Sequence, residues 1–534
     1  MRRSVSFARI TPGCANWINT LADLGECHSL ATLSETLTAG AIHGDASTAI
    51  TGIACNTELG DVQAGSLFAP LDLSSPRTAA LAAKAVSRGA AALLLERALD
   101  IPVPQLIVPD ARSALAVVAA TFYSHPANEI TCIGITGTAG KTTTTLLTYE
   151  ILRASGLRPG LIGTLDWRIG DFWNRHRTGR TTPEAPDVQR MLRDMVDVGD
   201  LTAILEASSQ GLEQHRLDTV PFSIGAMTHV TRDHLDFHGS LGAYRRAKAR
   251  LFERLDGVSG TAVLNADDPA SRRMAEYSTA ARILTYSAAG QGADVRATDI
   301  RPENEHTRFR LSLAGSSTTI QLPLPGTFNV ANALCAAAIA HAAEVPLANI
   351  AAGLTQSAPI PGLLTTVGAG QPFLVIIDEA KSAMALVQAL EVARQRTQQG
   401  RIIVVVSASE LVRPDLLRQR GEVAELAADY AVFTTARARL VDPASIVEHL
   451  ADGARAAGGI DGVTYACEPD RRSAMIHALA LARPGDCVLI TGKGIESSLE
   501  VGSLVIPWDD VAIARQILAQ MGYPLEPAWG EHLG

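Results

Sequence analysis

Aromatic residues are scarce in this chain: Phe, Trp and Tyr together make up 4% of its 534 residues. So few rings argue against stacking platforms for single-stranded nucleic acid. The net charge is −9, from 46 basic and 55 acidic residues, which argues against a broad surface that coats nucleic acid. We therefore expect no nucleic-acid partner.

The cysteine pattern and the lack of long apolar runs exclude further classes. The seven cysteines are scattered, odd in number and form no CxxC pair, so neither a disulfide framework nor a structural zinc site is expected. No apolar run reaches the roughly 18–20 residues that span a bilayer. The twin arginine near the start is followed by no apolar segment, and we expect a cytoplasmic protein without membrane insertion.

What is present is an alternation of short β-branched runs with longer Ala- and Leu-rich stretches, which is typical of α/β folds with mainly parallel sheets. At roughly 150 residues per domain, the length suggests three or four domains. We predict an N-terminal α/β domain (1–127), a central P-loop ATPase domain with a mainly parallel sheet (128–357) and a C-terminal Rossmann-like domain (358–534). The last has no GxGxxG, so nothing there indicates a dinucleotide.

A candidate phosphate loop follows the predicted strand 131–136 and precedes a predicted helix. Glycines let backbone N–H groups close around phosphate oxygens, a lysine reaches the outer phosphates, and a threonine hydroxyl can bind Mg²⁺. The spacing differs from GxxxxGK, since the glycines fall at 134, 137 and 140. The predicted nucleotide-binding residues of the loop are Gly137, Thr138, Ala139, Gly140, Lys141, Thr142 and Thr143.

This loop, T-G-T-A-G-K-T-T, resembles the phosphate loop of the Mur ligase family, and other segments agree with it in order. They are TTPE (181–184), EASSQGLEQHR, RDHLDFHGS (232–240), YRRAKARLF, LNADDP (264–269), GTFNVANALCAAA (326–338), PDRRSAMIHAL and LITGKGIE. The pattern is closest to the MurE-type branch. The resemblance is strong over 130–340, moderate over 370–520 and weak before residue 125.

The resemblance implies an ATP-dependent ligase of peptidoglycan synthesis that joins a carboxylate to an amine through an acyl phosphate. Its cofactors would be ATP and Mg²⁺, and its partners a carboxylate acceptor, such as a UDP-muramoyl-peptide, and an amino acid. The implied catalytic residues are Lys141, Glu206, His234 and Lys248. Thr142, Glu206, His234 and a carbamoylated Lys248 would be the metal ligands, although an ordinary surface lysine is the plain alternative for Lys248.

Further binding residues follow from the same resemblance. Asn329, Asn332 and Asp378 would contact ATP. Thr181, Thr182, Ser208, Gln214 and Arg216 would grip the acceptor. Arg439, Gly492 and Glu496 would hold the amino acid, with a surface arginine as the alternative for Arg439.

The chain also departs from the family pattern. The uridine-side DSR signature is missing from CNTELGDVQAGSLFAP. Leu363 stands where an ATP-contacting arginine is usual, Lys381 where a histidine is, and Val412 and Ala436 in the loops that clamp diaminopimelate. Losing a bidentate clamp weakens the binding of a diacid amine, so we expect a different amine.

Three hypotheses stay open at this point. We favour a MurE-type ligase with altered substrates. The second is ordinary peptidoglycan synthesis, in which the third residue joins a UDP-muramoyl-dipeptide. The third is a nucleotide-binding homologue without turnover. Leu363 and Lys381 favour it, but the intact Lys141, Glu206, His234 and Lys248 oppose it. The oligomeric state is not indicated.

Overall fold

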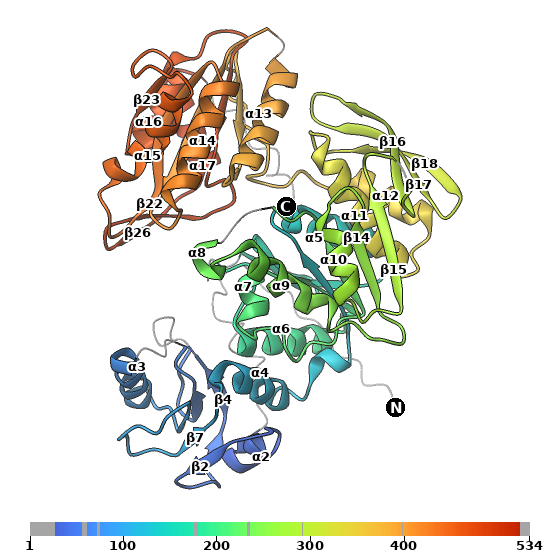
Figure 1. The fold of residues 1–534 in the computed structure, drawn as a ribbon, viewed down its shortest axis with the longest axis vertical. Helices are drawn as coiled ribbons and strands as arrows, with labels where there is room; N and C mark the ends of the chain where they lie inside the picture. Colours follow the sequence, from blue (N-terminus) through green and yellow to red (C-terminus); the bar gives the residue numbers. More distant parts are fainter. Residues whose placement is uncertain are drawn as a thin grey trace, which may run out of the picture. The chain divides into compact units, whose positions relative to one another are not determined.

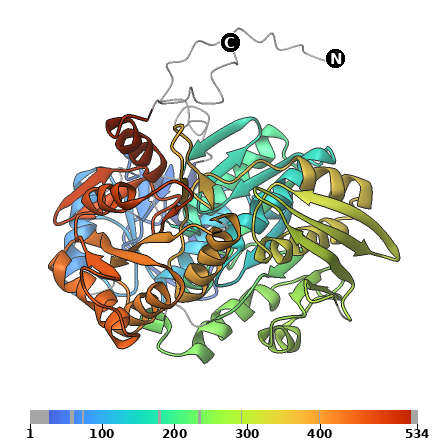
Figure 2. The same cartoon turned by 90° about the horizontal axis from the view of Figure 1, so that it is seen from above.

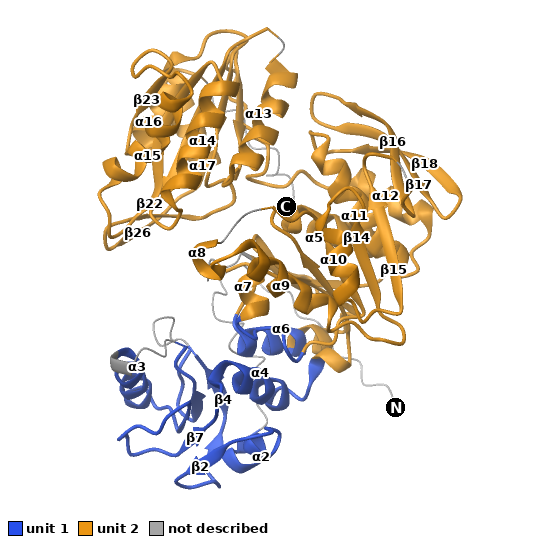
Figure 3. Ribbon diagram, in the orientation of Figure 1, with its two compact units in different colours: residues 1–126, 184–193, 214–219 blue, residues 127–183, 194–213, 220–534 orange. Residues whose placement is uncertain are grey.

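The computed structural model describes residues 27–55, 61–71, 75–175, 180–231, 235–290, 292–397 and 399–523. By its contacts the chain divides into two compact units (Figure 3). The first contains residues 1–126, 184–193 and 214–219, and the second contains the rest. The predicted division into three domains, with its boundary after residue 357, stays a prediction. Within the described ranges, no helix is both long and apolar enough to cross a bilayer.

The first unit is built on a five-stranded α/β sheet. Across the sheet its strands are β2 (Ala41–His43), β7 (Gln105–Ile107), β6 (Ala92–Leu95), β5 (Ser66–Phe68) and β4 (Gly52–Ala54). A small antiparallel pair, β1 (His28–Ser29) and β3 (Ala49–Ile50), is separate. The helices are α2 (Leu30–Glu35), α3 (Ser75–Ser87) and α4 (Ala111–Phe122), and α6 (Ala185–Val198) begins in this unit. The predicted α/β character of this region is confirmed.

An eleven-stranded sheet forms the centre of the second unit (Figures 1 and 2). In order its strands are β11 (Phe172–Arg175), β10 (Asp166–Ile169), β9 (Pro159–Ile162), β12 (Thr202–Glu206), β8 (Thr131–Thr136), β13 (Ile224–Met227), β14 (Thr261–Asn265), β15 (Arg282–Ser287), β16 (Val295–Pro302), β17 (Thr307–Leu313) and β18 (Ser316–Leu322). The strands from β9 to β16 are parallel. Parallel strands buried on both faces read as continuous apolar runs, which is why the strand at 131–136 could be predicted.

Helices of this unit bury the sheet and include α5 (Lys141–Ala154), α11 (Phe328–Ala342) and α12 (Leu347–Gln356). Their apolar side chains join those of the strands in one core cluster. The remaining helices are α7 (Ser209–Glu213), α8 (Leu235–His238), α9 (Leu241–Phe252) and α10 (Ala270–Tyr277). Because β8 lies between β12 and β13, the loops after these three strands meet at one edge of the sheet, where α/β folds bind ligands.

A second, mainly parallel sheet follows in the chain. Its strands are β19 (Thr365–Thr366), β20 (Leu374–Ile377), β24 (Cys487–Ile490), β21 (Ile402–Ser409), β22 (Tyr430–Ala438), β25 (Ser498–Val501) and β26 (Leu504–Pro507), with β23 (Tyr465–Cys467) paired to β22. Its helices are α13 (Ala383–Thr397), α14 (Pro414–Ala427), α15 (Pro443–Ala456), α16 (Arg471–Leu481) and α17 (Asp510–Gln520). Strands and helices alternate, as predicted for a Rossmann-like region.

A buried ion pair joins α16 to α17. Arg471 Nε and Nη2 donate to the Asp510 carboxylate at 2.9 and 2.6 Å, and both side chains are 0% exposed. Trp508 Nε1 also donates to Asp510, at 2.7 Å. The guanidinium reaches the carbonyl of Thr491 at 3.1 Å, so this pair ties both helices to the segment that follows β24.

Asp510→Ala is expected to lower the free energy of unfolding by about 3–5 kcal/mol, because it leaves a buried guanidinium without its counter-charge. Asp415→Ala is the matched control. Its partner Arg413 lies 2.9 Å away and both side chains are about half exposed, so its loss is worth at most about 1 kcal/mol. Urea titrations of the two variants and the wild type measure the difference. Equal losses in both variants would contradict the expectation.

Candidate functional site

The predicted phosphate loop lies between β8 and α5, as the sequence indicated. Gly140 is the N-cap of α5 and offers no side-chain hydrogen bond to the helix. The first N–H groups of a helix have no acceptor within the helix, so this end favours an anion. Gly140 has φ +83°, and a Cβ there would lie 2.3 Å from Asn332 Oδ1. The loop therefore requires glycine at this position and lies against α11.

Lys141 folds back over the loop. Its Nζ donates to the carbonyls of Gly137 and Thr138 at 3.0 and 3.1 Å. The next residue, Thr142, donates from its hydroxyl to Glu206 Oε2 at 3.1 Å. The structure thus brings Lys141 and Thr142 of the loop together with Glu206, which the sequence singled out in a separate segment.

Glu206 is the last residue of β12 and is only 2% exposed. Its carboxylate accepts from Thr164 N at 2.9 Å and from Thr164 Oγ1 at 2.7 Å. Burial raises the pKa of Glu206, and these hydrogen bonds together with the nearby charge of Lys141 oppose that rise. A buried carboxylate beside a lysine and two hydroxyls is the type of group that can bind a cation.

Lys248 reaches the same loop from α9. Its side chain is 1% exposed, and Nζ donates to Gly137 O at 2.7 Å. The ammonium also lies 4.4 Å from the ring centroid of Tyr244, whose hydroxyl is 2.9 Å from Thr138 Oγ1. The interpretation of Lys248 as an ordinary surface lysine is therefore wrong, while its carbamoylation stays a prediction.

Lysine is rare in this protein, and its positions are informative. Only five of the 46 basic residues are lysines, and four of them, at 141, 248, 381 and 493, lie in the segments that resemble the family. Elsewhere the chain uses arginine almost without exception. A lysine that arginine cannot replace indicates a compact ammonium or an amine with its own chemistry.

Two of the predicted metal ligands, Thr142 and Glu206, have the oxygen atoms that a magnesium ion requires. Mg²⁺ takes oxygen ligands, usually one or two carboxylates together with phosphate oxygens and water. Thr142 and Glu206 supply a hydroxyl and a carboxylate 3.1 Å apart. Among the described residues, no cluster of three or more His, Cys, Asp or Glu side chains could hold a metal. His234, the other predicted ligand, lies outside the described residues.

Two of the other predicted ATP contacts are buried near the loop. Asn329 donates to Pro325 O at 2.7 Å, and Asn332 donates to Asn329 Oδ1 at 3.1 Å.

The third predicted ATP contact, Asp378, follows β20 of the second sheet. It accepts from the backbone N–H groups of Leu364 and Ala380, each at 2.9 Å. Burial raises the pKa of Asp378 to about 7.

Three of the predicted acceptor residues lie next to Glu206. Thr182 Oγ1 donates to Glu206 O at 2.7 Å and lies 2.9 Å from Ser208 Oγ. Thr181 Oγ1 accepts from Thr164, the residue that binds the Glu206 carboxylate. Thr181 is thus linked to the Glu206 carboxylate through Thr164, whereas Thr182 and Ser208 are linked to the backbone carbonyl of Glu206.

Gln214 and Arg216, the other two predicted acceptor residues, belong to the first unit. There Arg216 Nη2 lies 3.1 Å from Glu184 Oε1 and donates to Gln214 Oε1 at 2.5 Å. The arginine that was expected to meet an acceptor carboxylate is thus paired with a carboxylate of the chain itself.

Glu496, predicted to bind the amino acid, is held between two lysines. Lys381 Nζ and Lys493 Nζ each lie 2.6 Å from its carboxylate. Partial burial alone would raise the pKa of Glu496, but the two ammonium groups outweigh it and lower the pKa to about 2. Lys381 also pairs with Glu379, at 2.7 Å. The charge of Lys381 is therefore matched by two carboxylates.

Arg439 directly follows β22, which pairs with β25. Its Nη1 is 3.5 Å from Glu500 Oε2, and its backbone N–H donates to Glu410 at 2.9 Å. The neighbouring Arg437 is 3.2 Å from the same oxygen of Glu500. Two arginines and two glutamates therefore neutralise each other here, and Val412 and Ala436 add no charge.

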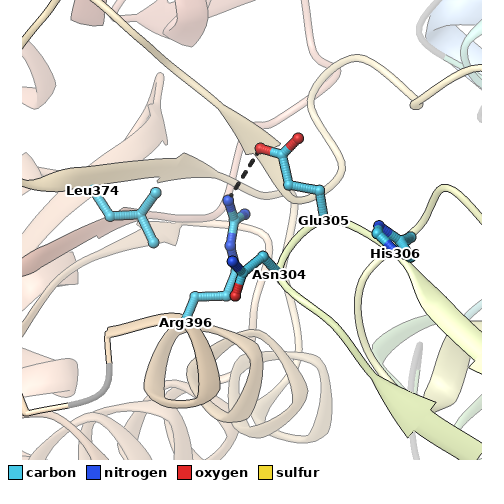
Figure 4. Close-up of a pocket in the computed structure, with 5 residues that line it drawn as sticks. All are labelled: Asn304, Glu305, His306, Leu374 and Arg396. Atoms are coloured by element: carbon cyan, nitrogen blue, oxygen red, sulfur yellow. Dashed lines mark hydrogen bonds and ion pairs between the residues drawn. The ribbon is translucent and has the colours of Figure 1, made fainter.

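One surface pocket lies away from all of these residues. It is lined by Asn304, Glu305, His306, Leu374 and Arg396, and an ion pair of 3.3 Å joins Arg396 to Glu305 (Figure 4). None of its residues was singled out from the sequence. We assign it no part in the site.

Sequence reasoning missed Thr164 and Tyr244, although both contact predicted residues directly. The signal for Tyr244 was present, because positions four apart in a helix face the same side and YRRAK places Tyr244 four before Lys248. Thr164 gave no such signal. It lies 42 residues from Glu206 and meets it only through the pairing of β9 with β12.

Comparisons with known proteins agree with this geometry. Residues 135–340 match the Mur ligase middle domain, and residues 364–494 match the glutamate ligase domain of Mur ligases. The UDP-N-acetylmuramyl-tripeptide synthetase of Roseiflexus sp. is 42% identical over 455 residues, which cover 82% of this chain and 89% of that protein. The UDP-N-acetylmuramoyl-L-alanyl-D-glutamate–2,6-diaminopimelate ligase of Geobacillus kaustophilus is 38% identical, covering 86% and 94%.

Solved structures give the same result. A UDP-N-acetylmuramoyl-L-alanyl-D-glutamate–2,6-diaminopimelate ligase superposes with a TM-score of 0.61 and 27% identity, covering 93% of this chain and all of that one. The resemblance seen in the sequence and the predicted fold class are both confirmed. The chain belongs to the Mur ligase family and is an ATP-dependent ligase that forms an amide bond between a carboxylate and an amino acid.

Proposed function

We propose that the protein adds an amino acid to the free carboxylate of UDP-N-acetylmuramoyl-L-alanyl-D-glutamate, the acceptor for which its Geobacillus relative is named. The observation that carries the proposal is the meeting of Lys141, Glu206 and Lys248 at one phosphate loop. The three residues come from separate segments, and their arrangement suits the transfer of a phosphoryl group between two anions. We also propose that the reaction takes place in the cytoplasm.

The reaction needs two balanced steps. The acceptor carboxylate attacks the γ-phosphorus of ATP, which forms an acyl phosphate and releases ADP. The amine then attacks the acyl carbon, inorganic phosphate leaves, and the amine gives up a proton as the amide forms. Lys141 and the uncapped N-terminus of α5 would bind the phosphates and stabilise the charge that develops on them. The hydroxyls of Thr181, Thr182 and Ser208 would orient the acceptor carboxylate.

We propose Thr142 and Glu206 as protein ligands of Mg²⁺, with Lys248 contributing after carbamoylation. The bound ion would offset phosphate charge, which lets two anions approach. Neighbouring residues hold these ligands in position. Thr164 donates two hydrogen bonds to the Glu206 carboxylate. Tyr244 contacts Thr138 through its hydroxyl and Lys248 through its ring.

We further propose that meso-diaminopimelate is not the preferred amine. Val412 and Ala436 carry no charge, and Arg437 and Arg439 are both paired with Glu500. A second carboxylate on the amine would thus find few free cations in this part of the protein. An ordinary MurE-type enzyme with an unchanged preference is the alternative.

Phosphate release from ATP and Mg²⁺ tests both proposals. With UDP-N-acetylmuramoyl-L-alanyl-D-glutamate as acceptor, release is expected only when an amino acid is also present. In a screen of amino acids, the best amine is expected to exceed meso-diaminopimelate at least about tenfold in kcat/KM, which is about 1.4 kcal/mol. Release without the acceptor would contradict the acceptor assignment. A clear preference for meso-diaminopimelate would contradict only the amine assignment.

A further inference from the structure

The hairpin formed by β25 and β26 leaves an open edge on the second sheet (Figure 1). Within the described ranges, no strand pairs with the outer side of β26, and all four residues of Leu504–Pro507 are exposed. Proteins usually protect such edges with charged side chains, because an open edge pairs readily with another chain. Residues 501–508 contain no charged residue, although 19% of the protein is charged. This edge therefore lacks the charges that would keep it in water.

The ladder between the two strands determines which backbone groups of β26 point outward. Val501 is opposite Leu504 across a two-residue turn, and the residues that close such a turn exchange both backbone hydrogen bonds. Bonded pairs then alternate along the ladder, and Trp508 N donates to Ser497 O at 2.9 Å, as this alternation requires. Val505 lies between two bonded pairs, so its N–H and C=O point away from β25. Both groups are available to a strand beside β26.

Exposed apolar side chains surround this open edge. Leu440 is 94% exposed and follows β22 two residues after Ala438, which pairs with Val501 of the hairpin. We call the exposed apolar residues of this region the hairpin surface; they are Leu440, Val441, Val501, Leu504, Val505 and Ile506. Together they expose on the order of 500 Å², which is the size of the largest apolar patches on monomers, and such patches are often functional.

We propose that β26 pairs antiparallel with β26 of a second copy of this chain, around a two-fold axis at Val505. Two identical antiparallel strands form a symmetric pair, so Val505 of each copy donates its N–H to, and accepts from, Val505 of the partner subunit. The second sheet then continues from one copy into the other. The apolar area of the hairpin surface is of the same order as the roughly 800 Å² that each partner of a stable dimer buries.

The edge favours a second copy over a charged partner. An uncharged segment meets its own copy without repulsion between like charges, and it offers a charged partner no ion pair. Pro507 lacks an N–H and limits the pairing to a short ladder centred on Val505. The dimer does not depend on the proposed function, because no residue of the hairpin surface is a predicted site residue.

The test compares Val505→Lys with Val463→Lys, a matched control in the same region of the chain. The two valines are similarly exposed, at 59% and 64%. In sedimentation velocity over a range of concentrations, the wild type is expected to reach twice the mass of one chain. Val505→Lys should raise the Kd of the dimer at least about tenfold, because two lysines would face each other across the axis. Val463→Lys should dimerise like the wild type, and both variants should keep its Tm and its turnover.

Disulfide cross-linking checks the register of the pairing. Opposed residues of a bonded pair have Cα atoms about 5.5 Å apart, which suits a disulfide. Under mild oxidation Val505→Cys should therefore form a covalent dimer. Leu504→Cys should not, because the pairing places Leu504 opposite Ile506 of the partner subunit. The wild type, with its exposed Cys27 and Cys467, gives the background.

Three results would overturn the proposal. The first is a wild type that stays a monomer at every concentration. The second is equal cross-linking of Val505→Cys and Leu504→Cys. The third is a loss of turnover in Val505→Lys with no change in the mass of the protein, which would mean that the hairpin surface is covered within one chain.

Discussion

Lys141→Ala is expected to reduce turnover at least about 1,000-fold, equivalent to about 4 kcal/mol of transition-state stabilisation. The ammonium is held at the loop by the carbonyls of Gly137 and Thr138, and its charge also acts on Glu206. It is therefore the cation placed to offset charge on a transferring phosphoryl group. Steady-state phosphate release with saturating substrates measures the loss.

Lys84→Ala is the matched control for this experiment. Lys84 is exposed on α3 in the first unit and is the one lysine outside the family motifs. Its variant should keep wild-type turnover, and both variants should keep the wild-type Tm. If Lys141→Ala lost less than about tenfold, the loop would not be the site of phosphoryl transfer.

The parts of the fold that the sequence predicted best are the fully buried strands. The segment 131–136 was predicted as a strand and is observed as β8 with the same bounds. Its continuous apolar run has one explanation, a parallel strand buried on both faces. The strand β16 and the antiparallel strands β17 and β18 that follow it were not predicted, although Thr307–Leu313 alternates buried and exposed side chains. That pattern is the signature of a half-buried strand, but it carries no motif.

In the candidate site, the residues that lie in local motifs could be predicted, whereas the contacts between distant segments could not. The family motifs identified Lys141, Glu206 and Lys248, because each belongs to a short local pattern. What the sequence could not provide is which side chains meet across long separations, such as Tyr244 with Thr138 over 106 residues. Nor could it show that Lys381 pairs with both Glu379 and Glu496. Contacts of this kind depend on the register of the sheets and on loop paths.

Lys248→Arg is expected to lose at least about 100-fold in turnover, although it keeps a positive charge beside Gly137 O. An arginine can still donate a hydrogen bond to that carbonyl, which Lys248 Nζ reaches at 2.7 Å. A guanidinium cannot take up CO₂, whereas a neutral lysine amine reacts with CO₂ to give a carbamate and a proton. If the residue works as a hydrogen-bond donor, arginine should largely replace it. If it works as an anion that binds a metal ion, arginine should not.

Chemical rescue distinguishes this role from a purely structural one. Lys248 is almost fully buried against Tyr244, so Lys248→Ala leaves space beside the loop that a small acid can enter. Acetate or propionate is expected to restore part of the activity of Lys248→Ala, while added bicarbonate should not. Bicarbonate should instead raise the activity of wild-type protein depleted of CO₂. The Tm of each variant is measured alongside, so that loss of folding is not mistaken for loss of the anion. Near wild-type turnover in Lys248→Arg would exclude a carbamate at this position.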